Sequence, residues 1–144
     1  MTEITGNLWD WLGRATLAIT TNGTVNRHGE CPMPRGCAGQ ARDRIPELPA
    51  ILGRLLREEG NHVYELGHGL VSFPVEHHWL DRPDPRLIEQ STRELATLAA
   101  ARGWPLVILP RPGCGGGGLE WRDIRPLLLP HLDDRFRIIA PPPA

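Results

Sequence analysis

Five glycines between two apolar segments are the residues whose types and spacing most clearly indicate chemistry. Gly113 and Gly115–Gly118 follow four apolar residues at 106–109, which predict a strand buried on both faces, and an amphipathic segment begins at Glu120. A strand, a glycine loop and a helix start can together point backbone N–H groups at an anion. Glycine permits φ > 0 and places no Cβ against a phosphate. We therefore interpret the loop as a phosphate cradle, although glycine clusters are usually flexible surface loops.

Two familiar phosphate-binding loops do not fit this stretch. A P-loop needs Lys and then Ser or Thr after its last glycine, whereas this chain has Leu119 and Glu120 there and contains no lysine. The dinucleotide fingerprint G-x-G-x-x-G is matched by Gly113, Gly115 and Gly118. It also requires an acidic residue about 20 residues further on, at the end of the next strand. That position falls at two isoleucines, 138–139, so we reject both assignments.

Acidic, imidazole and thiol side chains offer other chemistry. Glu76, His77 and His78 could act as general acid and base in the hydrolysis of an ester or a glycosidic bond. We favour the alternative that they end a strand, solvated or paired with Arg82. Cys114 could be a nucleophile in the glycine loop, but we favour a buried filler. Because the cysteines and histidines fit no zinc spacing, we expect no metal site.

The apolar pattern predicts strands alternating with helices. A β-rich run at 15–21 ends at the turn signal Asn22-Gly23. Asp84-Pro85 begins the helix with the clearest 3.6-residue period, which lasts to Gly103. The other predicted elements are a helical turn at 37–38, a helix at 49–59, strands at 62–66, 70–75 and 106–109, a short or kinked helix at 121–128 and a strand at 135–139. This order predicts an α/β fold with helices on both faces of a mixed sheet.

Composition and charge are those of one soluble domain. The 144 residues are 40% hydrophobic and 23% charged, and the net charge of −1 does not favour a nucleic-acid or membrane surface as the main partner. We expect a single domain over 1–140 and a proline-rich tail over 141–144. Three cysteines are too few for a disulfide scaffold, and no signal peptide or long apolar run is present. We therefore expect a cytoplasmic protein, and a monomer.

Four segments carry a resemblance to a known family. They read Thr-Asn-Gly at 21–23, Met-Pro-Arg-Gly-Cys-Ala at 33–38, Ser-Phe-Pro-Val-Glu-His-His-Trp at 72–79 and Leu-Pro-Arg-Pro-Gly-Cys-Gly-Gly-Gly-Gly-Leu-Glu-Trp at 109–121, with Leu-Asp-Asp-Arg-Phe following at 132–136. They resemble the macro domain, specifically the branch of terminal ADP-ribose protein glycohydrolase and its bacterial and phage relatives. The resemblance covers nearly the whole chain. It implies a three-layer α/β/α sandwich with a mixed central sheet, whose ligand crosses the carboxyl ends of the central strands.

The resemblance also implies a ligand, ADP-ribose or a derivative, with an ADP-ribosylated macromolecule as partner and no cofactor. By position, Asn7 and Leu8 would lie at the adenine end, and Phe136 or a neighbour would stack on adenine. The loop at 33–38 would lie against the diphosphate and distal ribose, opposite the glycine loop. The other implied ligand-binding residues are Asn22, Met33, Gly36, Cys37, Ala38, Pro110, Gly113, Cys114, Gly115, Gly116, Gly117, Gly118 and Leu119.

Four residues depart from the pattern of that branch. Asn7 stands where an adenine-binding Asp is expected, and Pro34 replaces a glycine, which removes an N–H donor. Glu76 stands near the position of the catalytic Lys, and Gly117 at that of the catalytic Asp. A covalent lysine mechanism needs an amine nucleophile. A chain without lysine cannot use it.

Three functional hypotheses follow. The first is a module that binds ADP-ribose through backbone amides without lysine-dependent chemistry. The second is a hydrolase of ADP-ribosylated or O-acyl-ADP-ribose substrates, which activates water with Asn22 or Glu76 as the catalytic candidates. The third is a degenerate macro fold used for protein interaction. An exposed apolar patch at Trp9 and Trp11 would favour the third, although two tryptophans this close are more often packed in a core.

Overall fold

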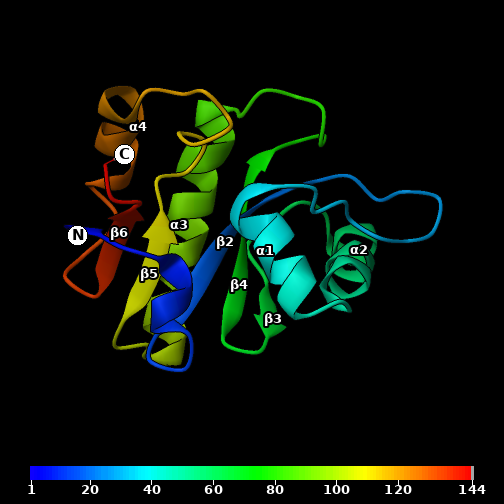
Figure 1. Cartoon of the computed structure of the whole chain (residues 1–144), viewed down its shortest axis with the longest axis horizontal. Helices are drawn as coiled ribbons and strands as arrows, with labels where there is room; N and C mark the ends of the chain where they lie inside the picture. The colour runs from blue at the N-terminus through cyan, green and yellow to red at the C-terminus, as the bar shows by residue number, and fades with distance from the viewer. Residues whose placement is uncertain (144) are drawn as a thin grey trace.

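A six-stranded mixed sheet forms the centre of the molecule, in the order β1-β6-β5-β2-β4-β3. The computed structural model describes residues 1–143. The strands are β1 (Thr2–Thr5), β2 (Thr16–Asn22), β3 (Glu65–Gly67), β4 (Leu70–Glu76), β5 (Val107–Pro110) and β6 (Phe136–Ala140). Every neighbouring pair is parallel except β3 with β4, which forms an antiparallel hairpin. The parallel strands therefore end along one edge, the upper edge in Figure 1.

Helices cover both faces of this sheet (Figure 1). One face carries α3 (Pro85–Arg102) and α4 (Trp121–Leu128), and the other carries the 3₁₀ helix η1 (Leu8–Trp11), α1 (Gly36–Arg44) and α2 (Leu48–Glu59). Each face has its own hydrophobic core, because alternate residues of a strand point to opposite faces. In β2, for example, Leu17 and Ile19 enter one core and Ala18 enters the other. The predicted three-layer α/β/α sandwich is confirmed.

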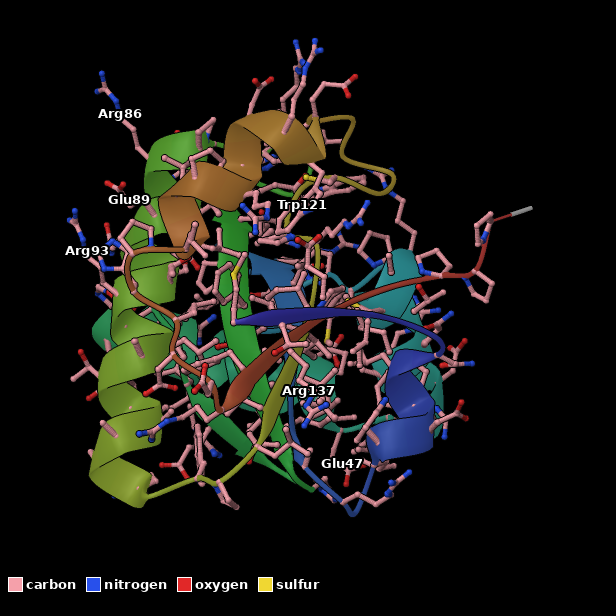
Figure 2. All side chains as sticks on the ribbon, turned by 90° about the vertical axis from the view of Figure 1, so that its left-hand side faces the viewer. Glu47, Arg86, Glu89, Arg93, Trp121 and Arg137 are labelled. Carbon is pink, nitrogen blue, oxygen red and sulfur yellow. The ribbon has the colours of Figure 1, made fainter. Side chains whose placement is uncertain are left out.

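The longest helix, α3, begins and ends where its sequence signals it. The Asp84 carboxylate accepts the N–H of Arg86 at 2.9 Å, and Gly103 closes the helix in the left-handed conformation with φ 64°. Its solvent face carries Arg86, Glu89 and Arg93, which point away from the molecule in Figure 2. Arg93 Nη2 lies 3.3 Å from Glu89 Oε1, one helical turn away.

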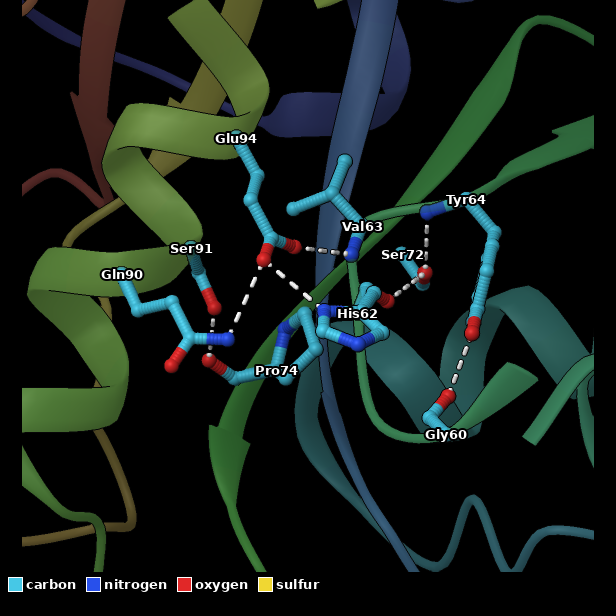
Figure 3. A network of polar contacts seen from close by, with 9 residues as sticks. All are labelled: Gly60, His62, Val63, Tyr64, Ser72, Pro74, Gln90, Ser91 and Glu94. Atoms are coloured by element: carbon cyan, nitrogen blue, oxygen red, sulfur yellow. Dashed lines mark hydrogen bonds and ion pairs between the residues drawn. The ribbon is translucent and has the colours of Figure 1, made fainter.

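A polar network fastens the segment before β3 to α3 (Figure 3). One carboxylate oxygen of Glu94 accepts the N–H of Val63 at 2.9 Å, and the other lies 2.8 Å from His62 Nδ1. The N–H of Tyr64 donates to the Ser72 hydroxyl at 2.9 Å. Because Ser72 lies in β4, this network ties β4, whose last residue is Glu76, to the segment before β3 and through it to α3.

The structure contains elements that the sequence did not predict. Residues 2–5 form β1, which pairs in parallel with β6. Three of its four side chains are exposed, so the segment shows no apolar alternation, and only the pairing with β6 makes it a strand. The single helical turn expected at Cys37-Ala38 extends over nine residues as α1. Within residues 1–143, no helix is both long and apolar enough to cross a membrane.

Candidate functional site

A pocket of about 360 Å³ lies over the carboxyl ends of β2, β4 and β5. Residues 34–38, at the start of α1, form one wall, and the glycine loop after β5 forms the opposite wall. Figure 1 shows this loop and the one after β4 crossing the same edge of the sheet. Ligand sites in open α/β sheets form at such an edge, outside the carboxyl ends of the strands.

Most of the site residues expected from the sequence line this pocket. They are Asn22, Gly36, Cys37, Ala38, Glu76, Pro110, Gly113, Gly115, Gly116 and Gly117. Seven others lie outside it: Asn7, Leu8, Met33, Cys114, Gly118, Leu119 and Phe136. The loop that the sequence indicated and the beginning of α1 therefore do face each other across a cavity.

Phe136 was wrongly expected to stack on adenine. Its side chain is 1% exposed in the core beneath α3 and α4. It pairs with Val107, the first residue of β5, and therefore lies at the amino ends of the parallel strands. The pocket lies at their carboxyl ends. The alternation in the last segment correctly predicted a strand, but only the register shows to which end each residue belongs.

Asn7, Leu8 and Met33 have side chains that serve the fold. The Asn7 side-chain oxygen accepts the N–H of Trp9 at 2.9 Å and so caps η1. Leu8 and Met33 are 7% and 2% exposed in the core on the α1 face, so neither side chain reaches the pocket. Asn7 follows the end of β1 and lies on the same edge of the sheet as the pocket.

Several pocket residues were missed by the sequence-based reasoning. They are Thr20, Thr21, Arg35, Val75, Trp79, Pro83 and Arg111, together with Pro34, which was weighed only as a departure from the family pattern. Arg35 and Arg111 stand inside the two segments that carried the resemblance, and their charge could have marked them as anion ligands. Trp79 and Pro83 come from the loop between β4 and α3, which has no periodic pattern.

The α1 wall presents the start of a helix to the pocket. Arg35 precedes the helix in an extended conformation, with φ −157°, and no side chain caps this end. The first backbone hydrogen bond of the helix is donated by the N–H of Gly39 to the carbonyl oxygen of Arg35, at 3.0 Å. The N–H groups at 36–38 precede that bond, and all three residues line the pocket. Uncapped N–H groups and the helix dipole together make this wall electropositive.

The glycine loop contains two kinds of glycine. A Cβ on Gly117 would lie 2.6 Å from Pro83 Cγ and 2.7 Å from the Gly113 carbonyl oxygen, so no side chain fits there. A Cβ on Gly115 would meet nothing within 4 Å, and one on Gly116 would meet only Arg35 Nε, at 3.8 Å. The packed glycines therefore fix the shape of the loop, and the open ones leave its backbone accessible.

Arg111, next to the glycine loop, is held by two other elements. Its guanidinium lies 3.6 Å from a carboxylate oxygen of Glu3 in β1, and over the ring of Trp121 in α4 at 5.2 Å from the centroid. Glu3 also accepts the indole N–H of Trp121, which is labelled in Figure 2, and the Nε–H of Arg125. These contacts, with the Arg125 hydrogen bond first, lower the pKa of Glu3. Arg111 thus occupies a defined position beside the pocket.

Glu76 ends β4 and contributes a carboxyl group to the pocket. The register of β2 and β4 shifts just before it, so that Asn22 pairs with Glu76 after Thr21 has paired with Pro74. Burial raises the pKa of Glu76, a contribution that Arg35 opposes and Asp81 reinforces. The neighbouring His77 was expected to be solvated or paired with Arg82. Its Nε2 atom instead lies 2.8 Å from a carboxylate oxygen of Asp84.

Asn22 and Thr21 line the pocket from the end of β2. The Asn22 amide donates to the Pro32 carbonyl at 2.8 Å, and its oxygen accepts the N–H of Thr24 at 2.9 Å. This side chain is therefore engaged in holding the loop after β2. The Thr21 hydroxyl oxygen is buried and has no hydrogen-bond partner.

The three thiols have different surroundings. Burial raises the pKa of Cys31 to about 12 and that of Cys114 to about 11. Cys114 packs at the edge of the α3–α4 core, as the filler role predicted. Cys37 instead lines the pocket, where its sulfur lies 3.4 Å from the Thr20 nitrogen. Residues 1–143 contain no group of three or more His, Cys, Asp or Glu side chains placed to hold a metal ion.

The fold is that of a macro domain. The macrodomain of Mycobacterium tuberculosis DarG superposes with a TM-score of 0.77 at 25% identity, over 99% of this chain and 97% of that one. The structure of Thermosipho africanus DarTG in complex with ADP-ribose matches with a TM-score of 0.76 at 21% identity, over 98% of this chain and 42% of that one. This chain therefore has the macro-domain fold and is similar to the macrodomain of DarG.

The chain is also similar in sequence to a protein whose name refers to ADP-ribosyl chemistry. The DNA ADP-ribosyl transferase–DNA ADP-ribosyl glycohydrolase fusion protein of Thermosipho africanus is 31% identical over 83 residues, which are 56% of this chain. The match spans only 21% of that relative's length. No family model matches the chain.

Proposed function

We propose that this chain binds ADP-ribose, free or attached to a macromolecule, in the pocket between α1 and the glycine loop. The observation that carries the proposal is the uncapped start of α1, with Arg35 beside it, facing open glycines across the cavity. Backbone donors, a helix N-terminus and an arginine are the groups that bind phosphates. The ADP-ribose complex of the similar Thermosipho protein supports the choice of ligand.

The proposed ligand runs along the carboxyl edge of the sheet. The diphosphate would lie between the N–H groups of 36–38 and the backbone at Gly115 and Gly116, with Arg111 on the β5 side. The distal ribose would lie toward Glu76 at the end of β4. Adenine would lie toward Asn7 and Leu8, at the far end of the same edge. The sheet order, which places β5 and β2 between β1 and β4, supports this path.

The lysine-dependent glycohydrolase reaction is not part of the proposal. The chain has no lysine, and Glu76 ends the strand near the position where that amine is expected. Gly117 stands at the position of the expected Asp, and packing against Pro83 leaves no room for a side chain there. The pocket therefore lacks both the aspartate and the lysine nucleophile that this reaction uses.

One observation favours a second function, hydrolysis of an ADP-ribosyl or O-acyl-ADP-ribose bond by activated water. A carboxyl group whose pKa is raised by burial lines the pocket at Glu76, and a carboxyl group in such a position can serve general acid–base catalysis. Turnover of O-acetyl-ADP-ribose or ADP-ribosylated protein that disappears in Glu76→Gln would establish this reaction. Trp9 is 8% exposed and Trp11 is partly buried against the same core, so the two tryptophans do not form the exposed patch that would favour an interaction module.

Calorimetric titration tests the binding proposal directly. ADP-ribose is titrated against the chain, with AMP and ribose 5-phosphate as partial ligands. We expect micromolar binding of ADP-ribose and weaker binding of both fragments. Gly116→Glu should abolish binding, because it places a carboxylate at the diphosphate.

Gly116→Ala is the matched control, since its Cβ would make only an ordinary contact with Arg35, and it should still bind. Absence of heat and of a thermal shift at millimolar ADP-ribose, in a folded protein, would refute the proposal.

A further inference from the structure

We propose that Glu76 makes the β4 end of the pocket selective for the charge on the terminal ribose. The subsite takes a ribose with a free hydroxyl, or with a neutral or cationic substituent, and rejects one that carries a second anionic group. This inference rests on the proposed function, and it names the class of ligand that the same site accepts.

The position of Glu76 follows from the sheet. β5, β2 and β4 are consecutive neighbours, and their last residues line the pocket as Pro110, Asn22 and Glu76. Neighbouring strands lie about 4.8 Å apart, so the end of β4 is about 10 Å from the end of β5. A diphosphate held beside the glycine loop at the end of β5 leaves the next sugar over the end of β4. Glu76 is therefore placed at the terminal ribose rather than at the phosphates.

The charges of the pocket are divided between its two ends. Arg111 stands on the β5 side, where Glu3 and Trp121 hold it. Glu76 stands on the β4 side, where Asp81 adds to the negative potential and Arg35 partly offsets it. The chain contains no lysine, and within residues 1–143 the one cation that acts on Glu76 is the Arg35 guanidinium, whose charge this carboxylate partly offsets. The pocket thus combines a cationic section for a diphosphate with an acidic end.

A carboxylate distinguishes hydroxyl groups from phosphate by simple chemistry. It accepts hydrogen bonds from ribose hydroxyls, whereas a phosphate offers it only acceptor oxygens. A terminal phosphate also brings a charge of about −1.5 to −2 at pH 7, and like charges repel strongly in a partly desolvated pocket. Glu76 is half-buried, so water screens this repulsion only in part. The free hydroxyl form is therefore favoured.

The experiment compares the affinities of ADP-ribose and ADP-ribose 1″-phosphate for the wild-type chain and for Glu76→Gln. In the wild type we expect the phosphate-bearing ligand to bind about 30-fold more weakly, a difference typical of one unfavourable charge contact. In Glu76→Gln the phosphate-bearing ligand should gain affinity, and the ratio should fall below about threefold. Glu120→Gln removes the same charge outside the pocket lining and should leave the ratio unchanged. Thermal unfolding of each variant confirms that it is folded.

Equal affinities in the wild type, or a ratio that persists in Glu76→Gln, would overturn the inference while leaving ADP-ribose binding intact. If the folded wild type binds neither ligand, the proposed function fails as well. The two failures are thus distinguished by the ADP-ribose titration alone.

Discussion

The two walls of the pocket use glycine and charge in different ways. The α1 wall is regular structure, whose helix begins without a side-chain cap and presents donors beside Arg35. The opposite wall is irregular, and two closely packed glycines shape it: Gly117, where no side chain fits, and Gly113, whose φ of 75° disfavours one. One wall therefore contributes electrostatics, and the other contributes shape and an exposed backbone. A site for a phosphorylated ligand needs both, because donors act only where side chains leave room for the anion to approach.

The largest effect is expected from Gly117→Asp, which restores the residue of the glycohydrolase branch. Its Cβ would collide with Pro83 and the Gly113 carbonyl, so the loop must move. We expect the free energy of unfolding to fall by about 2 kcal/mol. Loss of two or three hydrogen bonds to the ligand should weaken ADP-ribose binding by about 100-fold. Calorimetry and denaturant unfolding measure the two effects.

Gly115→Ala is the control for shape, because its Cβ would meet nothing within 4 Å. This variant should change the free energy of unfolding and the affinity for ADP-ribose only slightly. A Gly117→Asp variant with unchanged stability and affinity would show that the shape of the loop does not depend on close packing at this residue.

A smaller effect is expected from Arg35→Gln, which tests the charged wall. Loss of one charged hydrogen bond to the diphosphate should weaken ADP-ribose binding by about 20-fold. The loss should shrink as salt is raised, because ions screen exposed charges. Arg42→Gln removes the same charge from the same helix, where Arg42 pairs with Asp43. If both variants lose affinity equally, overall charge rather than the wall is responsible.

Thiol reactivity distinguishes the walls without a change of sequence. Cys37 faces the pocket, whereas burial raises the pKa of Cys114 to about 11 and reduces its reactive thiolate. Iodoacetamide should therefore alkylate Cys37 first, and ADP-ribose should slow that reaction. Mass spectrometry of peptides over time measures each rate. Equal rates at the two cysteines, or no protection by ligand, would contradict the placement of Cys37 inside the binding pocket.

The smallest effect concerns stability at the acidic end of the pocket. Because burial raises the pKa of Glu76 in the folded state, the folded protein binds this proton more tightly than the unfolded chain does. The protonated Glu76 carboxyl therefore stabilises the folded state relative to its ionised form. This stabilisation is fully present below the pKa that Glu76 has in the unfolded chain, and it is lost as pH rises through its pKa in the folded protein. Glu76→Gln should therefore raise the unfolding temperature by about 2 °C at pH 7.5. The difference should shrink at pH 4, and Glu120→Gln should show neither effect.

Local sequence signals determined much of the fold. Asp84 and Gly103 bound the helix that they predict, the Asn22-Gly23 turn ends β2, and the apolar run at 106–109 gives β5. These signals act through the residues themselves, by capping, by φ preferences and by apolar periodicity. The glycine cluster likewise indicated a wall of the pocket, because glycine is needed wherever a side chain would obstruct.

The tertiary structure decided what lies opposite that wall. Strand order brings the end of β4 beside the end of β2, and the register shift there turns Glu76 toward the pocket end that Arg35 also faces. Sheet pairing also makes a strand of residues 2–5 and sends Phe136 to the opposite end of the sheet from the pocket. These placements depend on partners distant in sequence, and no local preference encodes them. The sequence by itself thus determined the elements and the kind of loop, whereas pairing across the sheet decided which charges meet.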